Sequence, residues 1–546
     1  MDPLTRLPPE LILEVIAHVP LRSLPALRRT SSGWNALIGT HGDVIFRHVA
    51  ERELRVQAPC QKPDARHNDW KAVCQCAVTQ RLMRQGKIAT VDHFDFGRDF
   101  HPWRIKLDRE RQWMFATTRE GTEGEGGDEA DPQGLLVMDM RTKSIIQRIP
   151  EVKQYAHIEY DAGYLVATGP SGSAMTVYKT SLPDQPSSQR ETDASTVSSP
   201  SPTPPLAFHG TITSQGFRAL RLHGMSLLTA STRRIDVFDV VSLQLLQRIE
   251  IPAGQILHIT YVELDDEYIF VCALGRTEPA QVPVTPGQPL VYVYHRDSQA
   301  GTGLYAIIPL ISVKNPAYTP VSRQSVLSDP SVILHNPSFQ APMQDAKPLI
   351  PAEVQPFELT DPTHGLVPPF RPDFPVACHY GTRHLVILCR NGSVLIVEDY
   401  KMTLGLPDNE RNAKMFALTL PSNGPDYWNL AVEADLAYIT SYHERLFDPW
   451  AILVTIDLAS LRSHSANSPQ KSAEIDIRSW DIPLPLQMSS THSLQATSEG
   501  VYMTIEAVPL QDEPMLAEMS AGWVPPNYRR TAPERSSVLS LRYSRH

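Results

Sequence analysis

A change in hydrophobic periodicity near residue 86 is the feature that most constrains the fold of this chain. From Gly86 onward, apolar and β-branched residues occur in short alternating runs bounded by Gly, Asp, Asn and Pro. This pattern is typical of strands joined by turns. Proline is abundant, with 48 in 546 residues, and it is excluded from helix interiors and central strands. Residues 86–546 are therefore predicted to be β-structure with long loops.

One internal repeat shows how these strands are organised. The segment GLLVMDMRTKSIIQRIP ends at Pro150, and the similar segment RIDVFDVVSLQLLQRIEIP ends at Pro252. In both segments an apolar strand ends in an aspartate, Asp139 or Asp239, and a second strand carries Gln-Arg-Ile after the turn. An aspartate at this position can accept hydrogen bonds from the turn amides, so each segment is predicted to be a β-hairpin.

Seven units with the same strand order follow one another along the chain. Their third strands begin at Leu135, Ala174, Ile235, Leu290, Val394, Ile452 and Val538. When polar or proline-rich insertions near 121–133, 179–210, 313–373 and 507–535 are set aside, about 47 residues remain per unit, which suits a four-stranded propeller blade. The prediction is a mainly β fold, a seven-bladed β-propeller whose four insertions open on one face. Two β-sandwich domains are the alternative, because they also consist of short strands.

The propeller part is similar to a degenerate WD-repeat propeller. The one Trp-Asp pair, Trp480 and Asp481, does not end a third strand, and no Gly-His pair opens a unit. The last unit supplies only three strands, which leaves an exposed edge. The segment GKIATVDHF, Gly86 to Phe94, is therefore predicted to pair beside the strand VLSLRY that begins at Val538.

Residues 1–85 are predicted to be helical. The segment LPPELILEVIAHVP has two prolines where a first helical turn accepts them, and it stops at Pro20. Ser23 can cap a second short helix, and Ser31 or Ser32 a third. Three helices in fewer than about forty residues bury too little surface to be stable alone, so their apolar face is expected to have a partner.

The sequence LPPELILEVIAHVPLRSLPALRRTSSGWNALI resembles the F-box. It departs from the family pattern at Pro25 and Thr30, where a helix former and a Val are usual. The resemblance implies binding to the Skp-family adaptor of a cullin-RING ubiquitin ligase. The residues expected to contact that adaptor are Leu7, Pro8, Leu11, Ile12, Ile16, Leu24, Leu27 and Trp34. A helical hairpin packed on the main domain is the alternative.

The predicted domains are an F-box at 1–40, a helical linker at 41–85 and the propeller at 86–546. The linker contains Trp70, in an element similar to the one that fungal F-box proteins carry before a propeller. The linker contains four residues that could in principle bind zinc: Cys60, His67, Cys74 and Cys76. Zinc binding is not expected, because their spacing fits no common zinc finger.

Charge and motifs exclude several functions. A net charge of -10 offers no attraction to nucleic acid or to an anionic membrane. Six cysteines in 546 residues, without a signal peptide or a long apolar stretch, indicate a cytoplasmic or nuclear protein. The chain lacks a phosphate-binding glycine loop, HExxH, G-x-S-x-G and CxxC. No catalytic residue, cofactor or metal is therefore expected, although a propeller enzyme with an unrelated N-terminal hairpin is a further alternative.

The resemblance implies the substrate-recognition subunit of a Skp-cullin-F-box ubiquitin ligase, which acts by proximity. A scaffold or regulator that binds the Skp adaptor without substrate ubiquitination is the alternative. Loops on a rigid scaffold usually carry the binding function, so the substrate is expected on the face with the insertions. Arginines in its turns would bind a phosphorylated or acidic peptide, unless they are merely solvated. They are Arg233, Arg234, Arg276, Arg390 and Arg445.

Overall fold

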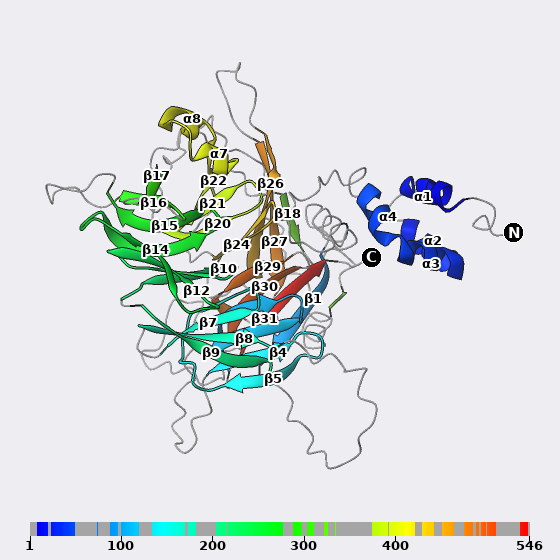
Figure 1. Ribbon diagram of the computed structural model, residues 1–546, viewed down its shortest axis with the longest axis horizontal. Helices are drawn as coiled ribbons and strands as arrows, with labels where there is room; N and C mark the ends of the chain where they lie inside the picture. Colours follow the sequence, from blue (N-terminus) through cyan, green and yellow to red (C-terminus); the bar gives the residue numbers. More distant parts are fainter. Residues whose placement is uncertain are drawn as a thin grey trace, which may run out of the picture. The chain divides into compact units, whose positions relative to one another are not determined.

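The structure is a computed structural model of the whole chain (Figure 1). It divides into two compact units, of which the second comprises Val91–Ala496 and Val501–Ser540. The first comprises Met1–Thr90, Thr497–Gly500 and Leu541–His546. The residues that the structure describes are 8–19, 23–49, 74, 88–96, 100–118, 134–169, 173–181, 204–214, 216–276, 288–296, 303–310, 322–325, 333–334, 374–390, 392–420, 429–441, 450–462, 474–483, 487–490, 493–497, 500–508 and 535–543.

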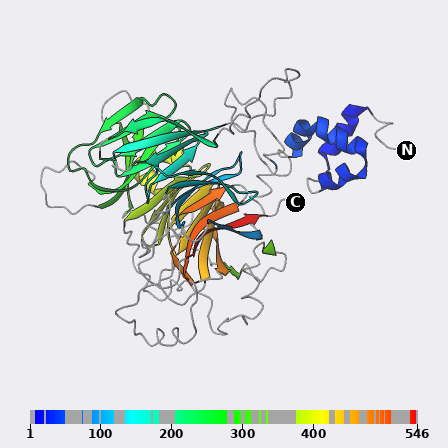
Figure 2. The same ribbon diagram turned by 90° about the horizontal axis from the view of Figure 1, so that it is seen from below.

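Four short helices fold at the N-terminal end of the first unit (Figure 2). They are α1 (Pro9–Ala17), α2 (Leu24–Thr30), α3 (Ser32–Thr40) and α4 (Gly42–Val49). The predicted caps explain two of the starts, since proline occupies the first turn of α1 and the Ser31 hydroxyl accepts a hydrogen bond from the Trp34 amide at 3.3 Å. One apolar cluster holds the helices together. Its buried members are Ile12, Ile16, Leu24, Ile38, Ile45 and Cys74.

The second unit contains six blades, each built on four consecutive antiparallel strands. Blade 1 is β2 (Pro102–Asp108), β3 (Trp113–Thr118), β4 (Leu135–Asp139) and β5 (Ser144–Ile149). Blade 2 is β6 (Ile158–Asp161), β7 (Tyr164–Thr168), β8 (Ala174–Thr180) and β9 (Leu206–Thr213). Blade 3 is β10 (Ala219–His223), β11 (Ser226–Ala230), β12 (Arg234–Asp239) and β13 (Leu245–Glu250).

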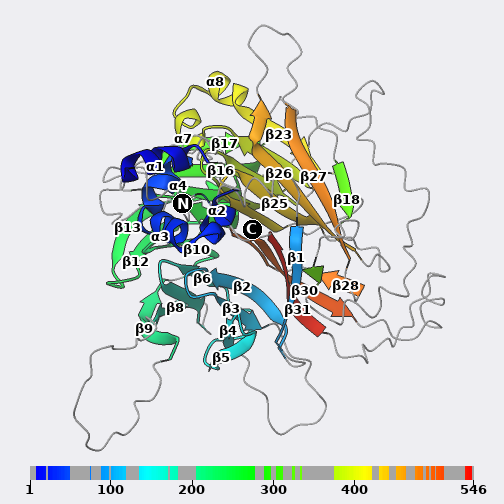
Figure 3. The ribbon, with the colours of Figure 1, turned by 90° about the vertical axis from the view of Figure 1, so that its right-hand side faces the viewer.

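The other three blades follow the same order of strands, and Figure 3 shows the sheets fanned around a common centre. Blade 4 is β14 (Ile256–Leu264), β15 (Tyr268–Gly275), β16 (Gln288–His295) and β17 (Leu304–Pro309). Blade 5 is β20 (Pro375–Tyr380), β21 (Leu385–Cys389), β22 (Ser393–Val397) and β23 (Met415–Thr419), with α7 (Tyr400–Thr403) and α8 (Asp408–Ala413) before its last strand. Blade 6 is β24 (Asn429–Glu433), β25 (Leu436–Ser441), β26 (Trp450–Arg462) and β27 (Glu474–Pro483), and β18 (Ser322–Ser325) pairs with β27 in parallel.

One further sheet, the mixed sheet, combines strands from both ends of the propeller part. Its path is β19 (Ile333–Leu334), β1 (Ile88–Asp95), β31 (Arg535–Tyr543), β30 (Gly500–Val508) and β28 (Gln487–Ser490), and β29 (Leu494–Thr497) also pairs with β30. The predicted pairing of the segment after Gly86 with the last strand is confirmed, because β1 lies beside β31. The prediction of seven blades is corrected to six, because the mixed sheet is not a run of four consecutive strands.

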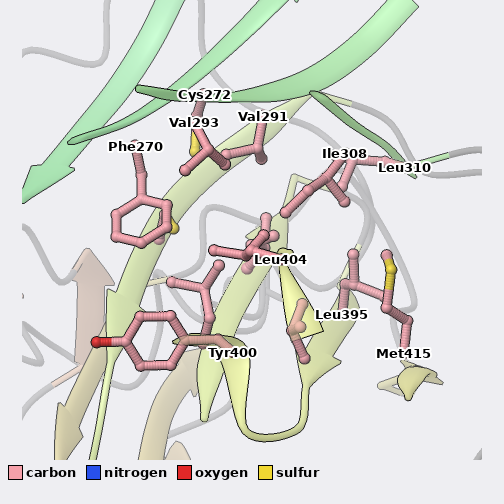
Figure 4. Close-up of a cluster of buried hydrophobic side chains, with 14 of the residues drawn as sticks. Phe270, Cys272, Val291, Val293, Ile308, Leu310, Leu395, Tyr400, Leu404 and Met415 are labelled. Atoms are coloured by element: carbon pink, nitrogen blue, oxygen red, sulfur yellow. The ribbon is translucent and has the colours of Figure 1, made fainter. Parts of the chain in front are cut away.

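Neighbouring blades pack face to face through continuous apolar clusters. The cluster between blades 4 and 5 includes Phe270, Val293, Leu395 and Met415 (Figure 4). Because the middle strands are covered on both faces, they are rich in apolar residues, and β21 is an uninterrupted apolar run. Similar clusters join blades 1 and 2, 2 and 3, 3 and 4, and 5 and 6. The mixed sheet packs on blade 1 through a cluster of the same kind.

The internal repeat corresponds to the outer hairpins of blades 1 and 3. As predicted, Asp139 accepts a hydrogen bond from the Arg141 amide at 2.8 Å, and Asp239 accepts one from the Ser242 amide at 2.9 Å. The repeated glutamine links each hairpin to the next blade. The Gln147 side chain donates to the Leu206 carbonyl at 2.9 Å and accepts from the Leu206 amide at 2.7 Å.

The predicted placement of all four insertions on one face is wrong. Connections from second to third strand, and from fourth strand to the next blade, lie at one end of the ring, here called the insertion end. The segment between β8 and β9 joins a third strand to a fourth, so it leaves from the opposite end, here called the turn end. Moreover, β9 begins at Leu206, inside the expected 179–210 insertion. Residues 121–133 lie outside the described residues.

Candidate functional site

The N-terminal helices present some apolar residues to solvent and bury others. On α1, Leu11 and Val15 are 53% and 55% exposed, whereas Ile12 and Ile16 are buried. Leu11 and Val15 are four residues apart, so they lie on one side of the helix. On α4, Val44 is 48% exposed. Leu11, Val15 and Val44 are therefore apolar side chains that these helices present to solvent.

The structure separates the eight residues expected to contact the adaptor into two groups. Pro8 and Leu11 are exposed, whereas Leu7 lies outside the described residues. The other five contribute to the apolar cluster of the helices. Of these, Ile12, Ile16 and Leu24 are buried, and Leu27 and Trp34 are half-buried against them. The sequence prediction overlooked Val15, although its spacing from Leu11 was a usable signal.

Of the arginines expected to bind substrate, Arg233, Arg276 and Arg390 lie in connections between second and third strands, at the insertion end, and Arg234 begins the third strand β12. Arg233 and Arg390 are exposed, and Arg276 is half-buried. The half-buried Arg234 already pairs with the Asp236 carboxylate at 3.1 Å. Arg445 lies outside the described residues. The described members therefore come from blades 3, 4 and 5.

A buried network of charged side chains, the channel network, lies on the first strands of the blades. The Glu159 carboxylate of β6 is contacted by Lys106 Nζ of β2 at 2.8 Å and by Arg221 Nη1 of β10 at 3.1 Å. Arg221 Nε also donates to Glu263 Oε1 of β14 at 2.8 Å. His379 Nδ1 of β20 lies 2.8 Å from Glu263 Oε2. The network thus runs through five successive blades.

Burial and pairing set the protonation of these groups. Burial opposes the ionisation of Glu159, but Lys106 and Arg221 outweigh it and hold the pKa of this carboxyl well below 4.5. Burial likewise opposes the ionisation of Glu263, and Arg221 and His379 still lower its pKa. Burial lowers the pKa of His379 below 6.5, even though Glu263 favours its charged form. At neutral pH the network therefore contains ionised carboxylates and a neutral His379.

The sequence prediction did not identify the channel network, although a signal exists. Lys106, Glu159 and Arg221 each lie two residues before the end of a first strand. Each has an apolar or aromatic residue directly on either side, in the segments RIKLD, IEYD and LRLH. Aligning the first strands of successive units would have placed these charges at one level of the ring.

The described residues contain neither a cluster of metal ligands nor a helix that could span a membrane. Among the described residues, no group of three or more His, Cys, Asp or Glu side chains could hold a metal ion. Of the cysteines and histidine considered for zinc, only Cys74 is described, and its buried thiol donates to the Phe46 carbonyl at 3.2 Å. Within the described part of the chain, no helix is long and apolar enough to cross a bilayer.

These observations define a mainly β protein with a β-propeller and an N-terminal helical region. A sequence model of the F-box domain matches residues 4–44. The chain is an F-box protein with a propeller. F-box domains bind Skp-type adaptors, and both F-boxes and propellers are typically non-catalytic interaction modules.

Two solved structures are similar to this chain at low sequence identity. No curated protein matches the chain. The solved structure of Kluyveromyces lactis Hsv2p is 9% identical and covers 68% of this chain and 83% of its own, with a TM-score of 0.35. The computationally designed Ika8 protein is 10% identical and covers 77% of this chain and 96% of its own, also with a TM-score of 0.35.

Proposed function

We propose that this protein is the substrate-recognition subunit of a Skp-cullin-F-box ubiquitin ligase. The observation that carries the proposal is the F-box at 4–44, whose helix α1 exposes Leu11 and Val15 beside a buried core. The propeller would hold a protein substrate, and the ligase would gain from the raised local concentration of substrate lysines. The chain would contribute no catalytic residue and would act in the cytoplasm or nucleus.

Substitutions on α1 test adaptor binding. Replacing Leu11 and Val15 together with Asp should reduce co-purification of the Skp-type adaptor by more than about tenfold, because apolar hot spots dominate such interfaces. Both side chains are already about half exposed, so the helices should stay folded by circular dichroism. Glu14→Gln, on the same helix and 73% exposed, is the matched control. Adaptor recovery at the wild-type level from the double variant would contradict the F-box assignment.

The same double variant separates a ligase from a scaffold. Proteins that bind the propeller should accumulate and lose ubiquitin conjugates when the variant replaces the wild type in cells. If their abundance and turnover stay unchanged while they still co-purify with the variant, the protein is an adaptor-bound scaffold.

The substrate surface remains a prediction at the insertion end. Arg233, Arg276 and Arg390 would pair with a phosphorylated or acidic peptide, because guanidinium groups bind phosphate and carboxylate bidentately. Arg233→Glu with Arg390→Glu should remove a subset of co-purified partners. Arg141→Glu is the control, because Arg141 lies in a third-to-fourth strand turn, at the other end, and is 66% exposed. An unchanged set of partners would leave the arginines without a role.

We also propose that the mixed sheet completes the ring beside the six blades. Support comes from the central cavity, which is lined by Gln495 of β29 together with a residue from the first strand of every regular blade. Further support comes from Arg109, between β2 and β3. Its guanidinium contacts both Glu433 carboxylate oxygens, at 2.7 and 3.0 Å, and the Ala496 carbonyl at 3.2 Å. The boundaries 1–40, 41–85 and 86–546 remain predictions.

A further inference from the structure

A polar cavity of about 230 Å³ lies at the centre of the propeller. The first strand of each blade and β29 of the mixed sheet each contribute one residue to its wall, one or two positions before the end of the strand. These seven residues are Lys106, Glu159, Arg221, Glu263, His379, Val432 and Gln495. The channel network therefore forms the wall of a cavity as well as linking the blades.

The cavity opens at the turn end. Asp161 and His223 line it and end their strands there, whereas Lys106 and Arg221 lie deeper. The side chain of Asp161 is 43% exposed. Asp266, in the turn between β14 and β15, is 61% exposed, and its carboxylate lies 3.3 Å from His223 Nε2. Solvent and a ligand can therefore enter between two carboxylates, at the end opposite Arg233 and Arg390.

The charges of the wall favour a cation. Three carboxylates line the cavity, from Glu159, Asp161 and Glu263, against two cations, Lys106 and Arg221. Both cations already pair with carboxylates of the channel network. Arg104 lies two residues before Lys106 on β2, farther from the turn end, and is not part of the cavity wall.

The buried carboxylate of Glu263 is already held by its neighbours in the wall. Glu263 is 2% exposed, and its Oε1 accepts from Arg221 and from the Leu264 amide. Its Oε2 forms an ion pair with His379 Nδ1 at 2.8 Å. The carboxylates that a ligand can reach are therefore those of Asp161 and Asp266 at the mouth of the cavity, which are 43% and 61% exposed.

We propose that this cavity binds the cationic side chain of a lysine or arginine presented by a protein partner. Its volume equals roughly that of seven to eight water molecules, which suits one long side chain and excludes a folded element. The ammonium or guanidinium group would lie beside the carboxylate of Asp161, which lines the cavity. The inference does not depend on the proposed ligase role.

Calorimetric titration of the full chain with small probes tests this assignment. N-acetyl-L-arginine amide or its lysine equivalent should bind about tenfold or more tightly than N-acetyl-L-citrulline amide, which has the shape of arginine without its charge. Asp161→Asn with Asp266→Asn should weaken that binding about tenfold. The asparagine at 161 keeps an acceptor for the Gly224 amide, now 2.7 Å from Asp161, so folding should persist. Asp239→Asn, in a turn outside the cavity, should change the affinity less than about twofold.

Several results would overturn the proposal. Equal binding of the citrulline and arginine probes would remove the role of charge, and tighter binding of an N-acetyl-phosphoserine amide would identify an anion site. If the double variant kept the wild-type affinity, or if the arginine and lysine probes showed no saturable binding, the cavity would be excluded as a binding site for a cationic side chain. If free L-arginine or spermidine bound more than about tenfold more tightly than the N-acetyl amide probes, the ligand would be a free amine and not a side chain of a protein. None of these outcomes would bear on adaptor binding.

Discussion

Replacing Glu159 with Gln is expected to destabilise the propeller strongly. Glu159 is 4% exposed and lies between Lys106 and Arg221, the cations of the β2 and β10 strands. The substitution leaves both cations without this carboxylate in a buried position. Removing one partner from a buried ion pair costs about 3–5 kcal/mol, most of it from the uncompensated charges. We therefore expect the free energy of unfolding to fall by about that amount.

Urea unfolding followed by tryptophan fluorescence measures the effect, with a melting scan in parallel. Glu110→Gln is the matched control, because Glu110 is 90% exposed and its nearest cation, Arg111, is 4.0 Å away. The control should change stability by less than about 0.5 kcal/mol. If Glu159→Gln were as mild as the control, the network would not hold the blades together.

A double substitution tests the physical reason. Lys106→Met with Glu159→Leu replaces a charged pair by apolar side chains of similar size. Where uncompensated charge is the cause, such a replacement recovers much of the stability that a single substitution removes. A double variant less stable than Glu159→Gln would refute the reasoning and indicate that the hydrogen bonds themselves, rather than unpaired charge, dominate.

Three other perturbations have expected outcomes. Burial lowers the pKa of His157 and His379 below 6.5, so as the pH falls these residues become protonated in the unfolded chain before they do so in the folded chain. The free energy of unfolding should therefore be constant above about pH 6.5 and fall as the pH drops toward the lowered pKa values, by about 1.4 kcal/mol per pKa unit. Melting temperatures that stay constant from pH 7 to 5 would contradict this. Arg109→Met should lower the free energy of unfolding by about 1 kcal/mol and speed proteolysis of the mixed sheet, and unchanged digestion would show that the contact is dispensable. Gly381→Ala should destabilise by about 2–3 kcal/mol, because its Cβ would lie 1.8 Å from the Ala434 carbonyl oxygen; a wild-type urea midpoint would exclude that close approach.

The sequence predicted the middle strands of the propeller well, for a physical reason. Strands buried on both faces are apolar runs, so Leu135, Ile235 and Val394 could be assigned to third strands from composition alone. Outer strands are covered on one side only and are harder to recognise. In β9, Leu206 is buried but Phe208 is 68% exposed, and the strand follows a polar proline-rich stretch. The prediction therefore placed its first half in an insertion.

The candidate sites were harder to predict than the strands. An F-box motif identifies the helices but does not say which apolar residues face inward, so the buried Ile16 and the exposed Leu11 were grouped together. The central cavity is harder still, because Lys106 and Glu263 are 157 residues apart and meet only once the ring has formed. A charge in a single short strand is indistinguishable from an ordinary solvated residue until the first strands are aligned.

The pairing of β1 with β31 has a consequence for synthesis of the protein. Roughly 440 residues separate Asp95 from Arg535, so the ribosome needs about 20 to 90 s to make the second strand after the first. During this interval the helices can fold while β1 lacks its neighbour. An unpaired strand edge that stays exposed this long can pair with the edge of another chain. The nascent chain should therefore depend on a chaperone until its last strand emerges. A ribosome-bound chain truncated before Arg535 should accordingly be more sensitive to protease throughout its blades than one that has released β31.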